Sequence, residues 1–133
     1  MSISAYSNPA GELRVCPRGY VLLRYAAGRH GAEAIAELLT QAGGLLLRHD
    51  YHGLLTDAGR LEGLREDALN WVVQHWLSHA VPQPARLHKA LVVPASPVAA
   101  AIATLRARAP HATHYAYFGS FAAAHHYLAT LAA

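Results

Sequence analysis

The chain of 133 residues has one cysteine, no acidic residue after Asp67, and no apolar run approaching the length of a membrane span. The single Cys16 excludes an intrachain disulfide, and the first residues lack the basic and apolar segments of a secretory signal. We therefore expect a cytoplasmic protein without a membrane span. Charged residues make up only 14% of the chain and hydrophobic residues 53%, which excludes a disordered protein.

The distribution of charge is uneven but does not indicate nucleic-acid binding. All eight acidic residues lie at or before Asp67, and the rest of the chain has four basic residues. Four basic residues are too few and too scattered to form a nucleic-acid footprint. The composition predicts a mildly basic surface and no nucleic-acid partner.

Residues 66–96 are the most regular stretch and predict a helix followed by a strand. The apolar residues at helical spacing are Leu69, Val72, Val73, Trp76, Leu77 and Ala80. Two prolines, Pro82 and Pro84, end this helix because proline cannot continue its hydrogen bonds. The apolar run at 90–93 does not alternate, which is typical of a strand covered on both faces.

The remaining segments predict an α/β fold, with strands and helices in alternation. Residues 1–11 contain Ser, Asn, Pro and Gly, so we expect a loose terminus followed by a single domain over 12–133. The expected strands are 12–16, 20–26, 53–56, 90–93 and 114–118, and the expected helices are 32–49, 66–80, 98–108 and 121–132. This order gives a four- to five-stranded, mostly parallel mixed sheet with an N-terminal hairpin, covered by about four helices. Residues 28–31 are expected to form a loop and residues 61–65 a connection.

Several landmarks occur in an order that resembles the STAS-like superfamily, which has the fold of bacterial anti-sigma-factor antagonists. They are the strand ending in Asp57, the pair Trp71 and Trp76 on the next helix, the strand of Lys89 to Val93, and Tyr117-Phe118-Gly119-Ser120-Phe121 before an alanine-rich helix. The resemblance covers about residues 13–132, and the chain looks most similar to a poorly characterised bacterial branch of this superfamily. It implies a non-enzymatic regulatory module that acts through protein–protein contacts.

The resemblance also implies a phosphorylatable serine after the strand-ending aspartate, at the start of the following helix. Here Asp57 is followed by Ala58-Gly59-Arg60-Leu61, which contains no hydroxyl group. A phosphorylation switch is therefore not expected, although Asp57, Gly59 and Arg60 remain a candidate surface for a protein partner. CRAL-TRIO lipid-transfer domains share this fold, so a carrier of a small apolar ligand is the alternative function.

No constellation in the sequence predicts catalysis or a cofactor. His75 and His79 have the i, i+4 spacing of metal ligands, but no third ligand has suitable spacing, so no metal site is predicted. The second half of the chain has no acidic residue to orient a catalytic base, and no nucleophile-elbow motif occurs. Cys16 lies beside Pro17 without a neighbouring base, and we interpret it as an ordinary strand residue.

Trp71 is the candidate anchor for self-association. On a helical wheel it lies opposite the apolar stripe, with His75 one turn further along the same side. A large aromatic side chain away from the core either lies under a neighbouring segment or contacts a partner. The second interpretation predicts a homodimer in which Trp71 and His75 belong to the interface.

Overall fold

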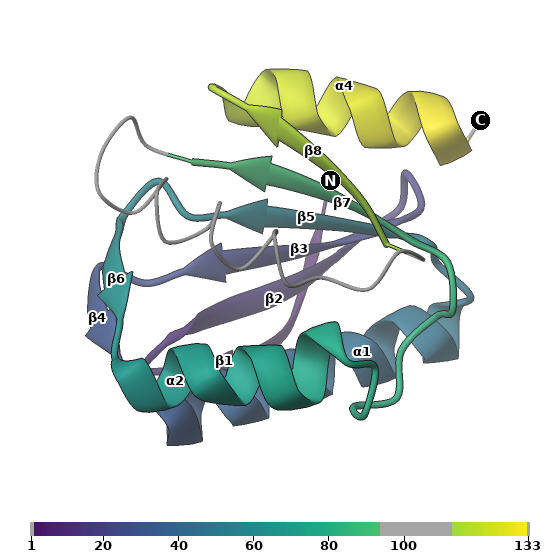
Figure 1. Ribbon diagram of the computed structural model, residues 1–133. Helices are drawn as coiled ribbons and strands as arrows, with labels where there is room; N and C mark the ends of the chain where they lie inside the picture. The colour runs from purple at the N-terminus through teal and green to yellow at the C-terminus, as the bar shows by residue number, and fades with distance from the viewer. Residues whose placement is uncertain (1, 94–112, 133) are drawn as a thin grey trace.

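The computed structural model describes residues 2–93 and 113–132, in which helices cover both faces of a six-stranded sheet (Figure 1). Helices α1 (Ala32–His49) and α2 (Glu66–Trp71) lie on one face, and α4 (Phe121–Ala132) lies on the other. None of the described helices is both long and apolar enough to cross a membrane. The predicted α/β class is confirmed, and the helix expected at 98–108 lies outside the described residues.

The main sheet has the spatial order β1-β2-β3-β5-β7-β8. Its strands are β1 (Ile3–Asn8), β2 (Gly11–Cys16), β3 (Tyr20–Tyr25), β5 (Gly53–Asp57), β7 (Leu87–Val92) and β8 (Thr113–Phe118). The first three strands pair antiparallel, and β3, β5, β7 and β8 pair parallel. The predicted hairpin is therefore β2–β3. The described sheet has six strands, where four or five were expected.

The extra strand corrects the expectation that residues 1–11 form a loose terminus. Strand β1 pairs with the outer edge of β2, so its backbone is held although its side chains show no apolar alternation. Two of its side chains also reach α1: the Tyr6 hydroxyl donates to Glu37 Oε2 at 3.3 Å, and Asn8 Nδ2 donates to the Ala34 carbonyl at 2.9 Å. These contacts order a terminus that is polar in composition.

A second small sheet replaces the loop and the connection expected at 28–31 and 61–65. Strand β4 (Gly28–His30) pairs parallel with β6 (Leu61–Leu64) at one end of the main sheet (Figure 1). Both segments are too short to show a period of two residues, and each contains a glycine. Backbone pairing between distant segments forms this sheet, and the sequence has no local signal for it.

The helix expected at 66–80 is shorter and changes type within its length. Helix α2 continues directly into the π-helix η1 (Val72–Leu77). The fully buried residues are Ala68, Val72, Trp76 and Leu77, whereas Ala80 is exposed. Trp76 and Leu77, which are adjacent in sequence, both lie in the core that η1 forms with α1.

The glycine pair in α1 has a packing explanation. The helix is continuous through Gly43 and Gly44, as predicted. A Cβ atom on Gly43 would lie 2.2 Å from the Pro82 carbonyl oxygen, whereas one on Gly44 would meet no atom within 4 Å. Gly43 therefore permits the segment after η1 to pass directly against α1.

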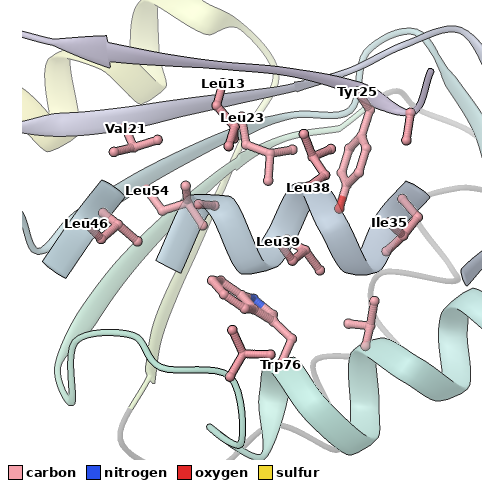
Figure 2. Close-up of a cluster of buried hydrophobic side chains, with 14 of the residues drawn as sticks. Leu13, Val21, Leu23, Tyr25, Ile35, Leu38, Leu39, Leu46, Leu54 and Trp76 are labelled. Atoms are coloured by element: carbon pink, nitrogen blue, oxygen red, sulfur yellow. The ribbon is translucent and has the colours of Figure 1, made fainter. Parts of the chain in front are cut away.

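The central strands bury both faces in two separate cores. Leu54 packs with α1 and η1, whereas its neighbour Leu55 packs with α4. Figure 2 shows the first core, where Leu23 and Leu54 from the sheet meet Leu38 and Leu39 of α1 and the indole ring of Trp76. Burial on both faces explains why these strands are continuously apolar in sequence.

Candidate functional site

Asp57 lies at the carboxyl end of β5 and organises the turn that follows. Its Oδ2 accepts a hydrogen bond from Arg24 Nε at 3.2 Å, and its Oδ1 accepts one from the Gly59 backbone N–H at 2.9 Å. The Asp57 side chain is only 19% exposed. The carboxylate is therefore held from two directions and fixes the start of the turn.

Arg24 connects this carboxylate to two further side chains. Its Nη1 atom lies 3.6 Å from Glu12 Oε1, and its guanidinium carbon lies 5.7 Å from the centre of the Phe121 ring. Arg24 and Phe121 are each 37% exposed. Partly exposed ion pairs contribute about 1 kcal/mol or less, so this network contributes little to stability and mainly arranges charge beside an exposed aromatic ring.

The turn after Asp57 is held to the neighbouring strand β7 on one side and exposed to solvent on the other. The Ala58 N–H donates to the Val92 carbonyl at 2.8 Å, and the buried Ala58 side chain leaves Gly59 and Arg60 exposed. Arg24 thus connects Asp57 with Phe121 in one surface where β3 and β5 end and α4 begins, and Gly59 and Arg60 follow Asp57 in the turn. We call it the edge patch; its residues are Arg24, Asp57, Gly59, Arg60 and Phe121.

Phe121, like Arg24, is a residue of this patch that the sequence did not identify. It directly follows Ser120, whose hydroxyl accepts a hydrogen bond from the Ala123 N–H at 3.3 Å near the start of α4. By helical spacing Phe121 lies roughly on the same face as Ala124 and Leu128, which are both buried. The structure instead leaves it exposed, stacked on His125 with ring centres 6.2 Å apart.

Trp71 and His75 form a separate group on the helical layer. Trp71 is half-buried and packs against the core, which corrects the expectation that it projects away from the apolar stripe. The exposed His75 ring lies 5.1 Å from the Trp71 ring with the planes tilted by 32°. In the described part of the chain, no hydrogen bond, ion pair or ring contact connects this group with Asp57, Gly59 or Arg60. The sequence-predicted interface residues therefore divide between two surfaces.

Cys16 is buried and belongs to the core beneath α4. Burial raises the pKa of its thiol above the ordinary value of 9.0, with a smaller opposing effect from its hydrogen bond with Tyr20. The Tyr20 hydroxyl in turn contacts His125 Nδ1. A buried, un-ionised thiol is a poor nucleophile, which agrees with the interpretation of Cys16 as a strand residue.

Lys89 is an unexpected charged residue in a core. It lies on β7, is 3% exposed, and its Nζ atom is 4.8 Å from the centre of the Trp76 ring. Burial lowers the pKa of Lys89 from 10.5 to about 7. Burial, and secondarily the charge of Lys89, also lowers the pKa of His79, which follows η1 with a left-handed φ of 63°. The i, i+4 relation of His75 and His79 expected from a continuous helix is therefore broken.

No protein-family model and no curated protein sequence matches the chain. One solved structure that resembles it is an uncharacterized protein of the DUF3478 family with a SpoIIAA-like fold from Shewanella loihica PV-4. Its TM-score is 0.59 at 13% identity, over 96% of this chain and 95% of that one. Another is the anti-sigma factor antagonist SpoIIAA in its unphosphorylated form, with a TM-score of 0.56 at 13% identity over 89% and 96% of the two chains. The chain therefore has the STAS-like fold that the order of its sequence landmarks predicted.

Proposed function

We propose that this chain is a non-enzymatic regulatory module that binds another protein through the edge patch. The observation that supports the proposal is the exposed Phe121 ring, held beside Arg24 while Arg24 is fixed by Asp57. Aromatic and arginine side chains are the residues that most often dominate protein interfaces. The likeness to an anti-sigma factor antagonist, a protein that acts on a protein, agrees with this function.

In this proposal the module works without phosphorylation of the edge patch. The turn residues Ala58, Gly59 and Arg60 carry no hydroxyl group. Thr56 precedes the turn and is buried within β5. Binding is therefore controlled by the supply of the partner or by changes elsewhere in the chain.

The proposal is tested by comparing partner capture by matched variants. The immobilised chain is incubated with an extract of its native cells, and bound proteins are quantified by mass spectrometry. Phe121→Ser and Arg60→Glu change exposed residues of the patch, and Leu47→Ser is a control because Leu47 is 49% exposed on α1.

We expect one protein to be captured by the wild type and by Leu47→Ser. The loss of an interface hot spot weakens binding roughly thirtyfold, so both patch variants should lose this protein. A protein that is retained equally by Phe121→Ser and Arg60→Glu would bind elsewhere, and the edge patch would not be its docking site.

We further propose that the chain forms a homodimer in which Trp71 and His75 belong to the contact. The half-buried indole is covered on one side by the exposed His75 ring, and a symmetric dimer would cover the remainder. A charge introduced at position 75 would place like charges together across the two-fold axis and weaken the dimer.

Sedimentation at neutral pH measures this association. His75→Glu is preferred to truncation of Trp71, because His75 is exposed and its replacement leaves the core intact. Gln74→Glu adds the same charge at the adjacent exposed position and is the control. We expect dissociation of His75→Glu and no change in Gln74→Glu. A wild type that is monomeric at tens of micromolar would leave Trp71 as a structural residue only.

A further inference from the structure

A pocket of about 450 Å³ opens at the end of the sheet opposite the edge patch. Strand β5 runs between the two sites, since Gly53 at its start lines the pocket and Asp57 at its end belongs to the patch. The lining residues are Gly19, Asp50, Tyr51, His52, Gly53, His88, Leu128 and Leu131. The size is that of sites for small molecules.

One side of the pocket is apolar. A Cβ atom on Gly53 would lie 3.2 Å from Tyr20 Cβ and 3.3 Å from Leu128 Cδ2, so only glycine fits there without displacing these side chains. Leu128 is buried, whereas Leu131, one turn further along α4, is 48% exposed. An apolar group bound in the pocket would cover the exposed part of Leu131 and gain stabilisation in proportion to the area covered.

The other side carries an oriented imidazole. His52 Nδ1 lies 3.2 Å from the Arg86 carbonyl oxygen, and a carbonyl can only accept, so Nδ1 carries a hydrogen and donates it. His52 Nε2 lies 3.4 Å from Asp50 Oδ1. Because Nδ1 is already the donor, Nε2 donates to a carboxylate only when the ring is protonated. The Asp50 side chain is 94% exposed, so water competes with this ion pair and an incoming anion can replace it.

A single acidic residue opposes an anion in this pocket. Asp50 is the only acidic residue among the described lining residues, and α4 has no acidic residue in its sequence. The titratable groups of the lining besides Asp50 are His52, His88 and Tyr51, and the exposed Arg18 and Arg86 adjoin the pocket in sequence at Gly19 and near His88.

We propose that this pocket binds a small monocarboxylate with a short apolar chain. The carboxylate takes the place of Asp50 beside His52 Nε2, and the chain lies against Leu128 and Leu131. This site is independent of the protein-docking function, because it lies at the other end of the sheet and shares no residue with the edge patch. The pocket is open to solvent at the end of the sheet. This distinguishes it from the internal cavity that a carrier of an apolar ligand requires.

The probe is sodium hexanoate, added at millimolar concentration to ¹⁵N-labelled protein at pH 6, with hexanol and hexylamine as neutral and cationic probes of the same chain length. We expect hexanoate to shift the backbone amide signals of Gly19, Gly53 and Leu131. Binding of hexanol should be about tenfold weaker, the factor that corresponds to the loss of one charge-assisted hydrogen bond.

Two pairs of variants locate the site. His52→Gln should weaken hexanoate binding about tenfold, whereas His126→Gln, at an exposed position of α4, should not change it. Leu131→Gln should weaken binding about threefold, and Leu47→Gln is its control at 49% exposure. The proposal is overturned if hexanoate shifts no amides of the pocket, if hexylamine binds as well as hexanoate, or if the control variants weaken binding as much as His52→Gln and Leu131→Gln.

Discussion

Replacing Lys89 by methionine should stabilise the protein. Lys89 is 3% exposed, and burial lowers its pKa from 10.5 to about 7 because an ammonium group is poorly accommodated in a core. The interval between these two values corresponds to about 5 kcal/mol of lost stability at neutral pH. Methionine fills a similar volume without charge, so we expect Lys89→Met to raise the free energy of unfolding at pH 7 by up to about 5 kcal/mol.

The pH dependence of stability distinguishes the cost of burying the Lys89 charge from a general effect of side-chain packing. Between pH 7 and 10.5 the unfolded chain holds a proton on Lys89 that the folded chain has released. The free energy of unfolding of the wild type should therefore rise with pH in this window, by at most about 1.4 kcal/mol per pH unit. Below pH 7 both states hold the proton, and the contribution of Lys89 becomes constant. Lys89→Met should lack the rise.

Urea unfolding followed by tryptophan fluorescence at pH 7, 8 and 9 measures both effects. The difference between variant and wild type at each pH removes the contributions of other titrating groups. Arg86→Met is the control, because Arg86 is exposed and only its backbone carbonyl is used in a hydrogen bond. A difference between variant and wild type that stays constant from pH 7 to 9, or a Lys89→Met variant less stable than the wild type at pH 7, would refute the reasoning.

Three further changes test the packing and the turn. Leu91→Ala should lower the free energy of unfolding by roughly 2–4 kcal/mol, because Leu91 is buried in β7; a loss under about 1 kcal/mol in a urea melt would mean that the strand is peripheral. Gly43→Ala should lower the free energy of unfolding by roughly 1–3 kcal/mol, because its methyl group would collide with the Pro82 carbonyl. Gly44→Ala should instead stabilise α1 by up to about 1 kcal/mol, and equal effects of the two variants in thermal melts would contradict the packing at Gly43. Incubation with native extract and ATP should leave Thr56 unmodified because it is buried in β5, and stoichiometric phosphate there, mapped by mass spectrometry, would contradict this.

The sequence was most informative where an element buries a continuous apolar surface. The helix at 32–49 was predicted with its observed ends because its apolar residues repeat at helical spacing. The structure adds the reason for a glycine within it, since Gly43 lies against the Pro82 carbonyl. The central strands were recognised because burial on both faces removes polar residues from them. In contrast, β1, β4 and β6 are short and largely polar, and they exist because distant backbone segments provide hydrogen-bonding partners.

The candidate site was only partly predictable for the same physical reason. Asp57, Gly59 and Arg60 could be placed at a strand end because the run Leu54-Leu55-Thr56 ends there. The roles of Arg24 and Phe121 depend on parallel pairing that places Asp57 beside Arg24 and on the position of α4 above the sheet. Lys89 precedes the apolar run 90–93 in sequence, and its burial depends on the position of Trp76 of η1 against β7.

The turn after Asp57 shows why likeness in fold does not transfer a regulatory switch to this chain. A phosphorylated serine at a helix start is stabilised by the free N–H groups and the dipole of that helix. Here Ala58 still pairs with Val92 of the neighbouring strand, the chain then turns through the hydrogen bond from the Leu61 N–H to the Ala58 carbonyl, and the whole of β6 follows before α2 begins at Glu66. A hydroxyl introduced at Ala58 would be buried and one at Gly59 would lie against the Asp57 carboxylate, so neither position meets a helix N-terminus. The geometry of this turn, and not only its missing serine, therefore differs from the arrangement that a phosphorylation switch at a helix start requires.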